Sequence, residues 1–235
     1  MAPFAVILVL LVVGGLIAWY AHVQAVRRRE ELTRLAGEVG WRYEPPHDGP
    51  LTDRLRRFSD LNQGHSHSAY NTLRGQIGMH GKPVDVCAGD YRYKITRNSG
   101  KNRSTTTYRL SYLLADLPFA TTPTLAVRKE HFFDKVAGAI GFDDIDFESK
   151  AFSDRFHVKS RDQRFAYDVI DPRMIEFLLR ESPRSVQLDR GRLLVVVDTR
   201  CWTPDEFRAN IAWTRAFLDQ WPRHVVDRLS SEVTY

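Results

Sequence analysis

The stretch FAVILVLLVVGGLIAWYA, residues 4–21, decides how this chain is arranged, because it contains no charged side chain. As an α-helix it would be about 27 Å long, which is close to the hydrocarbon thickness of a bilayer. Trp19 and Tyr20 lie near its end, where aromatic side chains favour the membrane–water interface. We therefore predict a single-pass transmembrane anchor within residues 1–25.

Basic residues follow this stretch, and Arg27, Arg28 and Arg29 form a juxtamembrane basic cluster. The positive-inside rule places such a cluster in the cytoplasm, so we expect the rest of the chain at the cytoplasmic face of the cell membrane. A cleaved signal peptide is the alternative, with residues 23–25 (VQA) as a passable cleavage motif. Against cleavage, the leader lacks a basic n-region and its apolar core is long for an h-region.

The composition is that of a folded, basic protein. Hydrophobic residues make up 43% of the chain and charged residues 27%, with a net charge of +5, so a sizeable core is expected. A basic surface favours anionic partners in general. Because the chain is predicted to sit at a membrane, we expect membrane lipid and a protein partner rather than nucleic acid. Cys87 and Cys201 are expected to be reduced, since each lies in an apolar setting.

Working outward from the anchor, the pattern LAGEVGW at 35–41 recurs as VAGAIGF at 136–142. In each, a glycine would end a helix and an aromatic residue would enter a strand. Two further pairs of similar segments follow in the same order: 51–55 with 152–156, and 69–71 with 166–168. The recurrence predicts a duplicated unit, and chance matching of common small residues is the alternative.

Each copy is predicted to run helix, strand, short helix and hairpin. We therefore expect an α+β fold in which the transmembrane helix is followed by two such units with antiparallel sheets, over residues 26–120 and 121–235. In the first unit, alternating apolar residues predict a meander of strands with the basic segment 97–104 as a hairpin tip. In the second, helices are expected to start after Asp171 and Thr203, which suit N-cap positions.

The basic hairpin tip is the surface feature that we would test first. Lys94, Arg97, Lys101 and Arg103 fall at or near the turn between two predicted strands and could bind an anionic surface. Interleaved tyrosines could instead point to single-stranded nucleic acid, although their alternation is that of core strand residues. A simply solvated hairpin tip is the further alternative.

No motif in the chain specifies a catalytic residue, a cofactor or a metal. GHSHS at 64–68 lacks the last glycine of a nucleophile elbow, and His65, His67 and His80 lack ligand spacing. The acidic run at 143–148 alternates with Ile and Phe, as a solvated strand would. No phosphate-binding loop or dinucleotide fingerprint is present.

The segment 134–179 carries the pattern DFES…RFAYD…PRM. It resembles a family of actinobacterial-type single-pass membrane proteins of unknown function. The resemblance covers most of the chain after the anchor and implies no catalytic residue, cofactor or ligand.

The sequence thus favours a membrane-anchored binding or scaffolding module and leans away from an enzyme. A membrane-tethered enzyme, with its site in the groove between the two repeats, is the alternative. A concave pocket with converging titratable side chains would favour the enzyme, and a filled groove would favour the binding module.

Overall fold

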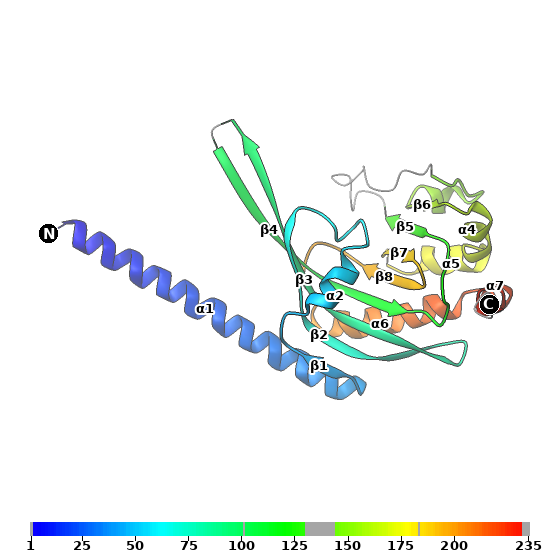
Figure 1. Cartoon of the computed structure of the whole chain (residues 1–235), viewed down its shortest axis with the longest axis horizontal. Helices are drawn as coiled ribbons and strands as arrows, with labels where there is room; N and C mark the ends of the chain where they lie inside the picture. The colour runs from blue at the N-terminus through cyan, green and yellow to red at the C-terminus, as the bar shows by residue number, and fades with distance from the viewer. Residues whose placement is uncertain (1, 101, 130–143, 183, 232–235) are drawn as a thin grey trace.

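A computed structural model describes residues 2–100, 102–129, 144–182 and 184–231 of the chain. Helix α1 (Ala2–Val39) runs unbroken from the apolar stretch into the folded body. It ends as predicted at Gly40, which adopts a left-handed φ of +69°. The Trp41 amide then donates to the Ala36 carbonyl at 2.8 Å, which closes the last turn of the helix. Figure 1 shows α1 extending from the body as a single long arm.

The described strands form one antiparallel sheet, in the order β1-β2-β3-β4-β8-β7-β5-β6. The strands are β1 (Arg42–Glu44), β2 (His65–Met79), β3 (Lys82–Ser99), β4 (Asn102–Asp116), β5 (Leu125–Lys129), β6 (Phe156–Ser160), β7 (Ser185–Asp189) and β8 (Arg192–Val196). The pairing of β4 with β8 joins the two halves of the chain into this one sheet. The α+β class and the antiparallel meander expected from the sequence are therefore present.

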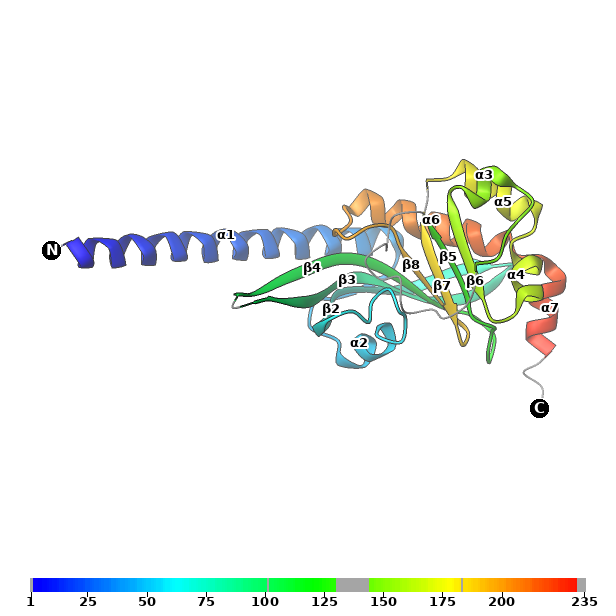
Figure 2. The same ribbon diagram turned by 90° about the horizontal axis from the view of Figure 1, so that it is seen from above.

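Helices cover both faces of the sheet, and Figure 2 shows α1 and α6 on one face and α2 on the other. The remaining helices are α2 (Gly49–Leu55), α3 (Lys150–Ser153), α4 (Gln163–Val169), α5 (Pro172–Arg180), α6 (Pro204–Asp219) and α7 (Arg223–Ser231). The predicted N-caps are confirmed, because Asp171 accepts from the Met174 amide and Thr203 forms a capping box at the start of α6.

Two hydrophobic cores lie on the two faces. The larger one joins α1, through Leu32, Leu35 and Ala36, to α6 and to the inward side chains of the sheet. The smaller one lies under α2 and includes Tyr91 and Tyr93, so these tyrosines are core residues. The spacing of 32, 35 and 36 follows the helical period, which is why only one side of α1 is buried.

Strands β3 and β4 extend beyond the rest of the sheet as a two-stranded hairpin. They pair without a register shift from Asp85–Asp116 to Ser99–Asn102, whereas β2 pairs with β3 only as far as Lys94. The hairpin and the N-terminal half of α1 point to the same side of the body in both views (Figures 1 and 2).

The proposed duplication is not confirmed. The second glycine pattern, 136–142, lies outside the described residues. Residues 51–55 lie in α2, while 152–156 run from the end of α3 into β6. The third correspondence is wrong, because residues 69–71 lie in strand β2 and 166–168 in helix α4.

The physical reason is local to α4. The Asp162 side chain accepts from the Phe165 amide and starts a helix there, and Phe165, Ala166 and Val169 bury one face of it. A similar trio of residue types thus follows a helical period in one place and a strand period in the other.

Candidate membrane-proximal interface

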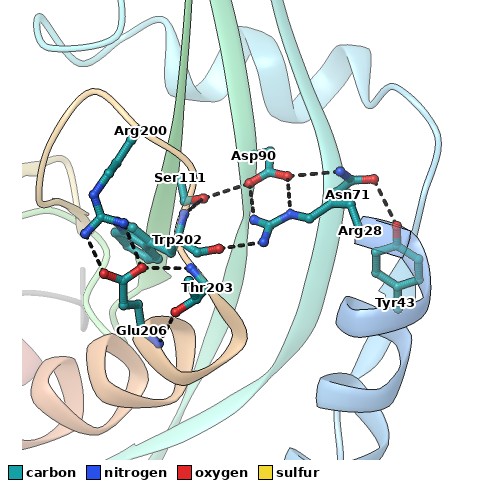
Figure 3. Close-up of polar contacts among 9 residues, drawn as sticks. All are labelled: Arg28, Tyr43, Asn71, Asp90, Ser111, Arg200, Trp202, Thr203 and Glu206. Carbon is teal, nitrogen blue, oxygen red and sulfur yellow. Dashed lines mark hydrogen bonds and ion pairs between the residues drawn. The ribbon is translucent and has the colours of Figure 1, made fainter. Parts of the chain in front are cut away.

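Arg28 fastens α1 to the sheet at the point where the helix meets the body. It lies one turn before Leu32 on the buried side of α1, so the helical period aims it at strand β3. Its Nη2 donates to Asp90 Oδ1 at 2.8 Å and its Nε to Asp90 Oδ2 at 3.2 Å. Its Nη1 donates to the Trp202 carbonyl at 2.5 Å. Figure 3 shows these contacts, which we name the Arg28 clamp: Arg28, Asp90, Asn71, Ser111 and Trp202.

The acceptor of the clamp is a buried and fully bonded carboxylate. Asp90 is 1% exposed, and besides Arg28 it accepts from Asn71 Nδ2 at 2.9 Å and Ser111 Oγ at 2.7 Å. Tyr43 donates in turn to Asn71 Oδ1 at 2.9 Å. Burial raises the pKa of Tyr43 to about 12, so the phenol keeps its proton near neutral pH. A buried ion pair of this kind is costly to break once both ends are desolvated.

The start of α6 forms the other side of the same junction. The Trp202 amide donates to Ser111 Oγ at 2.9 Å, and the Arg28 guanidinium lies 5.5 Å from the centre of the Phe207 ring. Arg208 of α6 also forms an ion pair with Glu38 of α1. Helix α1 is therefore held at several points: by a buried ion pair, by apolar packing and by a surface ion pair.

Most of α1 before this junction is apolar and exposed. Among the described residues, every large hydrophobic side chain that is strongly exposed lies on α1, except Tyr167. The described residues contain one helix long and apolar enough to cross a membrane, and α1 is that helix. An exposed apolar surface of this extent is unusual on a soluble monomer and is normal for a segment in lipid.

The β3–β4 hairpin presents a basic face on the same side of the sheet as α1. Arg92 pairs with Arg109 across the strands, and Asn98 pairs with Arg103, while side chains in directly opposite positions share one face. Arg92 and Lys94 are two and four residues from Asp90 along β3, so their side chains lie on the same face of the strand as Asp90, which faces α1. The basic face therefore consists of Arg92, Lys94, Arg103 and Arg109, all of which are exposed.

Arg97 is an odd number of residues from Asp90 along β3, so its side chain lies on the other face, toward α2, with Tyr91 and Tyr93. Tyr93 and Tyr108, which are paired in register, stack with ring centres 5.2 Å apart. Tyr91 donates to the Leu61 carbonyl at 3.1 Å. The aromatic side chains on this face of the hairpin are therefore engaged in packing against the smaller core.

Not all of the predicted site residues fall together. Lys94, Arg97 and Arg103 are exposed on the hairpin as expected, but on two faces, and Lys101 lies outside the described residues. In the juxtamembrane cluster, Arg27 and Arg29 are exposed, whereas Arg28 is engaged in the clamp.

Sequence reasoning missed Arg92, Arg109 and Asp90. A usable signal was present for the two arginines, because no acidic residue occurs from Tyr91 to Ala115.

The three histidines considered as metal ligands in the sequence lie apart in the structure. His65 lies at the start of β2 and contacts Thr96 Oγ1 at 3.0 Å, and His67 contacts the Tyr91 hydroxyl at 3.0 Å. His80 lies beyond the other end of β2 and contacts the Trp221 carbonyl at 2.9 Å. Within the described part of the chain, no cluster of metal-ligating side chains is found.

Both cysteines are free thiols. Burial, reinforced by the nearby Asp90 carboxylate, raises the pKa of Cys201 to about 11, and burial also raises the pKa of Cys87. Arg74 donates to Cys87 Sγ at 2.9 Å. A thiol with a raised pKa carries little thiolate at neutral pH and is a poor nucleophile.

A pocket of about 760 Å³ lies beside the end of α1 and is lined by Trp41 and by residues of strands β2 and β3. Two of the arginines that line it are already in ion pairs: Arg54 contacts Asp116 at 2.5 Å, and Arg74 contacts Glu44 at 2.7 Å. The pocket is concave, as an enzyme site would be, but its Arg54, Arg74 and Asp116 side chains are held in ion pairs.

The fold and this junction define a class: an α+β protein in which one antiparallel sheet is fastened to a helix of membrane-spanning length. No protein-family model and no curated protein matches the chain. The resemblance to the actinobacterial-type family therefore stays a prediction. Among solved structures, the chain is similar to the mycobacterial trehalose monomycolate transport factor A, TtfA. The match has a TM-score of 0.51 and 14% sequence identity, and it covers 83% of this chain and 96% of that chain. The similarity supports the fold.

Proposed function

We propose that this chain is a single-pass membrane protein that holds a binding or scaffolding body at the cytoplasmic face of the cell membrane. The observation that carries the proposal is the Arg28 clamp. One helix carries the exposed apolar surface, and seven residues beyond the apolar stretch 4–21 the same helix is tied to a buried carboxylate of the sheet. The body is thus held in a set orientation to the anchor rather than hanging from a flexible linker.

Three further observations support this role. Arg27 and Arg29 remain exposed at the exit of the apolar stretch, where the positive-inside rule expects cytoplasmic charge. The structural neighbour is described as a transport factor, a name that is compatible with a non-catalytic part in a membrane process. Finally, Arg54 and Arg74 beside the pocket are held in ion pairs, and burial raises the pKa of both thiols, which favours structure over catalysis.

The topology is tested with an epitope at the C-terminus of the full chain in intact cells. The proposal expects the epitope to resist external protease until the membrane is permeabilised. A cytoplasmic marker protein and an external marker protein serve as controls in the same sample. Digestion of the epitope in intact cells, or recovery of a chain shortened by about two dozen residues from the medium, would contradict the proposal.

The scaffolding part is tested by crosslinking the full chain in native membranes. We expect one or more protein partners whose capture is lost when Arg28 is replaced by alanine, since the body would then lose its set orientation. Arg34→Ala is the matched control, because Arg34 is exposed on the same helix. Equal capture by both variants would argue against a role for orientation.

A further inference from the structure

We propose that the basic face of the β3–β4 hairpin binds the phosphate headgroups of anionic membrane lipids beside the exit of α1. This inference rests on the proposed function, because it needs α1 to lie in a bilayer. Anionic lipid was also expected from the sequence, but the residue set differs from the one expected there. The set is Arg92, Lys94, Arg103 and Arg109, and it excludes Arg97, which the register places on the other face.

The basic face carries charge that no acidic residue within the described ranges balances. Arg92 and Arg109 lie directly opposite each other, an arrangement that repels in water. No acidic residue occurs between Tyr91 and Ala115, and none of the four basic residues forms an ion pair with another residue that the structure describes. The Arg92 guanidinium lies over the Tyr70 ring, 5.7 Å from its centre, which holds it in place. A phosphate bound between the two arginines would relieve their repulsion.

The hairpin is long enough to reach the end of the apolar stretch of α1. From Arg28 back to Ala21, the last residue of the apolar stretch 4–21, α1 rises by about 10 Å at 1.5 Å per residue. From Asp90, which contacts Arg28, strand β3 advances about 33 Å to Gly100 at about 3.3 Å per residue. The hairpin therefore reaches the level of Ala21 even if it diverges from the helix axis by up to about 70°. Both views show it directed to the side of the N-terminal half of α1 (Figures 1 and 2).

The direction of the basic face favours lipid phosphate over nucleic acid. The basic face turns toward α1, because Asp90, on the same face of β3, contacts Arg28. A ligand on this face therefore lies between the hairpin and the emerging helix, where the headgroup layer would be. The hairpin tyrosines Tyr91 and Tyr93, which could stack nucleic-acid bases, are on the opposite face and are packed in the smaller core, and Tyr70 on the basic face is covered by Arg92. Geometry and charge together favour lipid phosphate.

The test uses the full chain in detergent micelles, titrated with phosphatidylglycerol or phosphatidylcholine, with bound lipid counted by native mass spectrometry. The wild type is expected to prefer phosphatidylglycerol. Arg92→Gln combined with Arg109→Gln is expected to weaken that binding about 30-fold, since each basic group near an anionic surface contributes about five-fold. Residual binding at Arg27 and Arg29 should remain. Arg92→Lys with Arg109→Lys keeps the charge and is expected to keep most of the binding.

The matched control is Arg56→Gln combined with Arg97→Gln, which removes the same charge from the α2 side and should change binding less than about three-fold. An equal loss in the control, or no loss in the Arg92/Arg109 variant, would overturn the proposal. So would displacement of the lipid by inorganic phosphate at matched ionic strength, or tighter binding of a single-stranded oligonucleotide. Circular dichroism verifies that each variant is folded. The protease experiment above is independent of this one, so a failure of lipid binding and a failure of membrane topology are distinguishable.

Discussion

Replacing Asp90 by asparagine should destabilise the junction between α1 and the sheet more than any single charge removal on the surface. Asparagine has nearly the same shape as aspartate, but it cannot neutralise Arg28. Its amide group would also face the Asn71 and Arg28 donors that the carboxylate now accepts from. The substitution therefore leaves a positive charge without its partner inside the junction.

The magnitude follows from burial. Breaking a buried pair by removing one partner costs about 3–5 kcal/mol. The Asp90 side chain is 2% exposed and the Arg28 side chain 18%, so Arg28 recovers only part of its hydration. We expect a loss near the lower end, about 3 kcal/mol. For a chain of this size that corresponds to a fall in Tm of about 6–12 °C.

The assay is thermal unfolding of the full chain in lipid nanodiscs, followed by tryptophan fluorescence. Asp85→Asn is the matched control, because Asp85 lies in the same strand and is exposed. It should shift the Tm by less than about 2 °C. A double-mutant cycle with Arg28→Met should give a coupling energy of at least about 1 kcal/mol. Additive effects, or an Asp90→Asn chain as stable as the control, would refute the clamp.

Three further predictions concern the body. Burial raises the pKa of Asp60 to about 6, because it outweighs the opposite effect of the Arg128 guanidinium. The Asp60 carboxyl therefore binds its proton more tightly in the folded state than in the unfolded state. The stability that protonated Asp60 contributes is therefore lost as pH rises from about 4 to 6, and the unfolding free energy should fall by about 1–3 kcal/mol. Unfolding measured over a series of pH values should show that the Asp60→Asn variant lacks this fall. Gly75→Ala would place a Cβ 2.1 Å from Trp41 Cδ1 and should cost about 1–3 kcal/mol with a change in indole fluorescence, whereas Gly78→Ala in the same strand has room and should be near neutral. Thr203→Ala removes the N-cap of α6 and should lower the unfolding free energy by about 1 kcal/mol, and restoration by serine but not by valine would verify the capping role.

The sequence predicts the local elements well because their signals are local. Eighteen residues without charge, a glycine after a helical period, and an Asp or Thr before a proline each act within one or two turns. Gly40, Asp171 and Thr203 accordingly lie where the patterns expected them. The alternation that placed Tyr91 and Tyr93 in a strand also predicted that they would be buried.

The tertiary partners could not be predicted, because they depend on long-range pairing. Arg28 and Asp90 are 62 residues apart, and nothing in either neighbourhood marks them as a pair. Arg28 appeared in the sequence as one of three equivalent basic residues. Only the helical phase set by Leu32 and Leu35, together with the position of β3 beside α1, separates it from Arg27 and Arg29.

The faces of the hairpin were partly open to prediction. Once Ser99 is known to pair with Asn102 at the turn, the alternation of side chains along β3 and β4 places Arg92 and Arg109 on one face and Arg97 on the other. The sequence did not fix the exact turn, and a shift of one residue would have reversed every assignment. The duplication failed at its third block for a related reason, since similar residue types can follow either period.

The most direct test of the account is the width of the distance distribution between α1 and the sheet in a bilayer. Spin labels are introduced through an unnatural amino acid at Gln24 and Gln76, so that Cys87 and Cys201 stay native, and the full chain is measured in nanodiscs by pulsed electron resonance. The account predicts one narrow distance that becomes broad in the Arg28→Ala variant and stays narrow in Arg34→Ala. A broad distribution in the wild type would contradict it, because the body would then hang freely from its anchor.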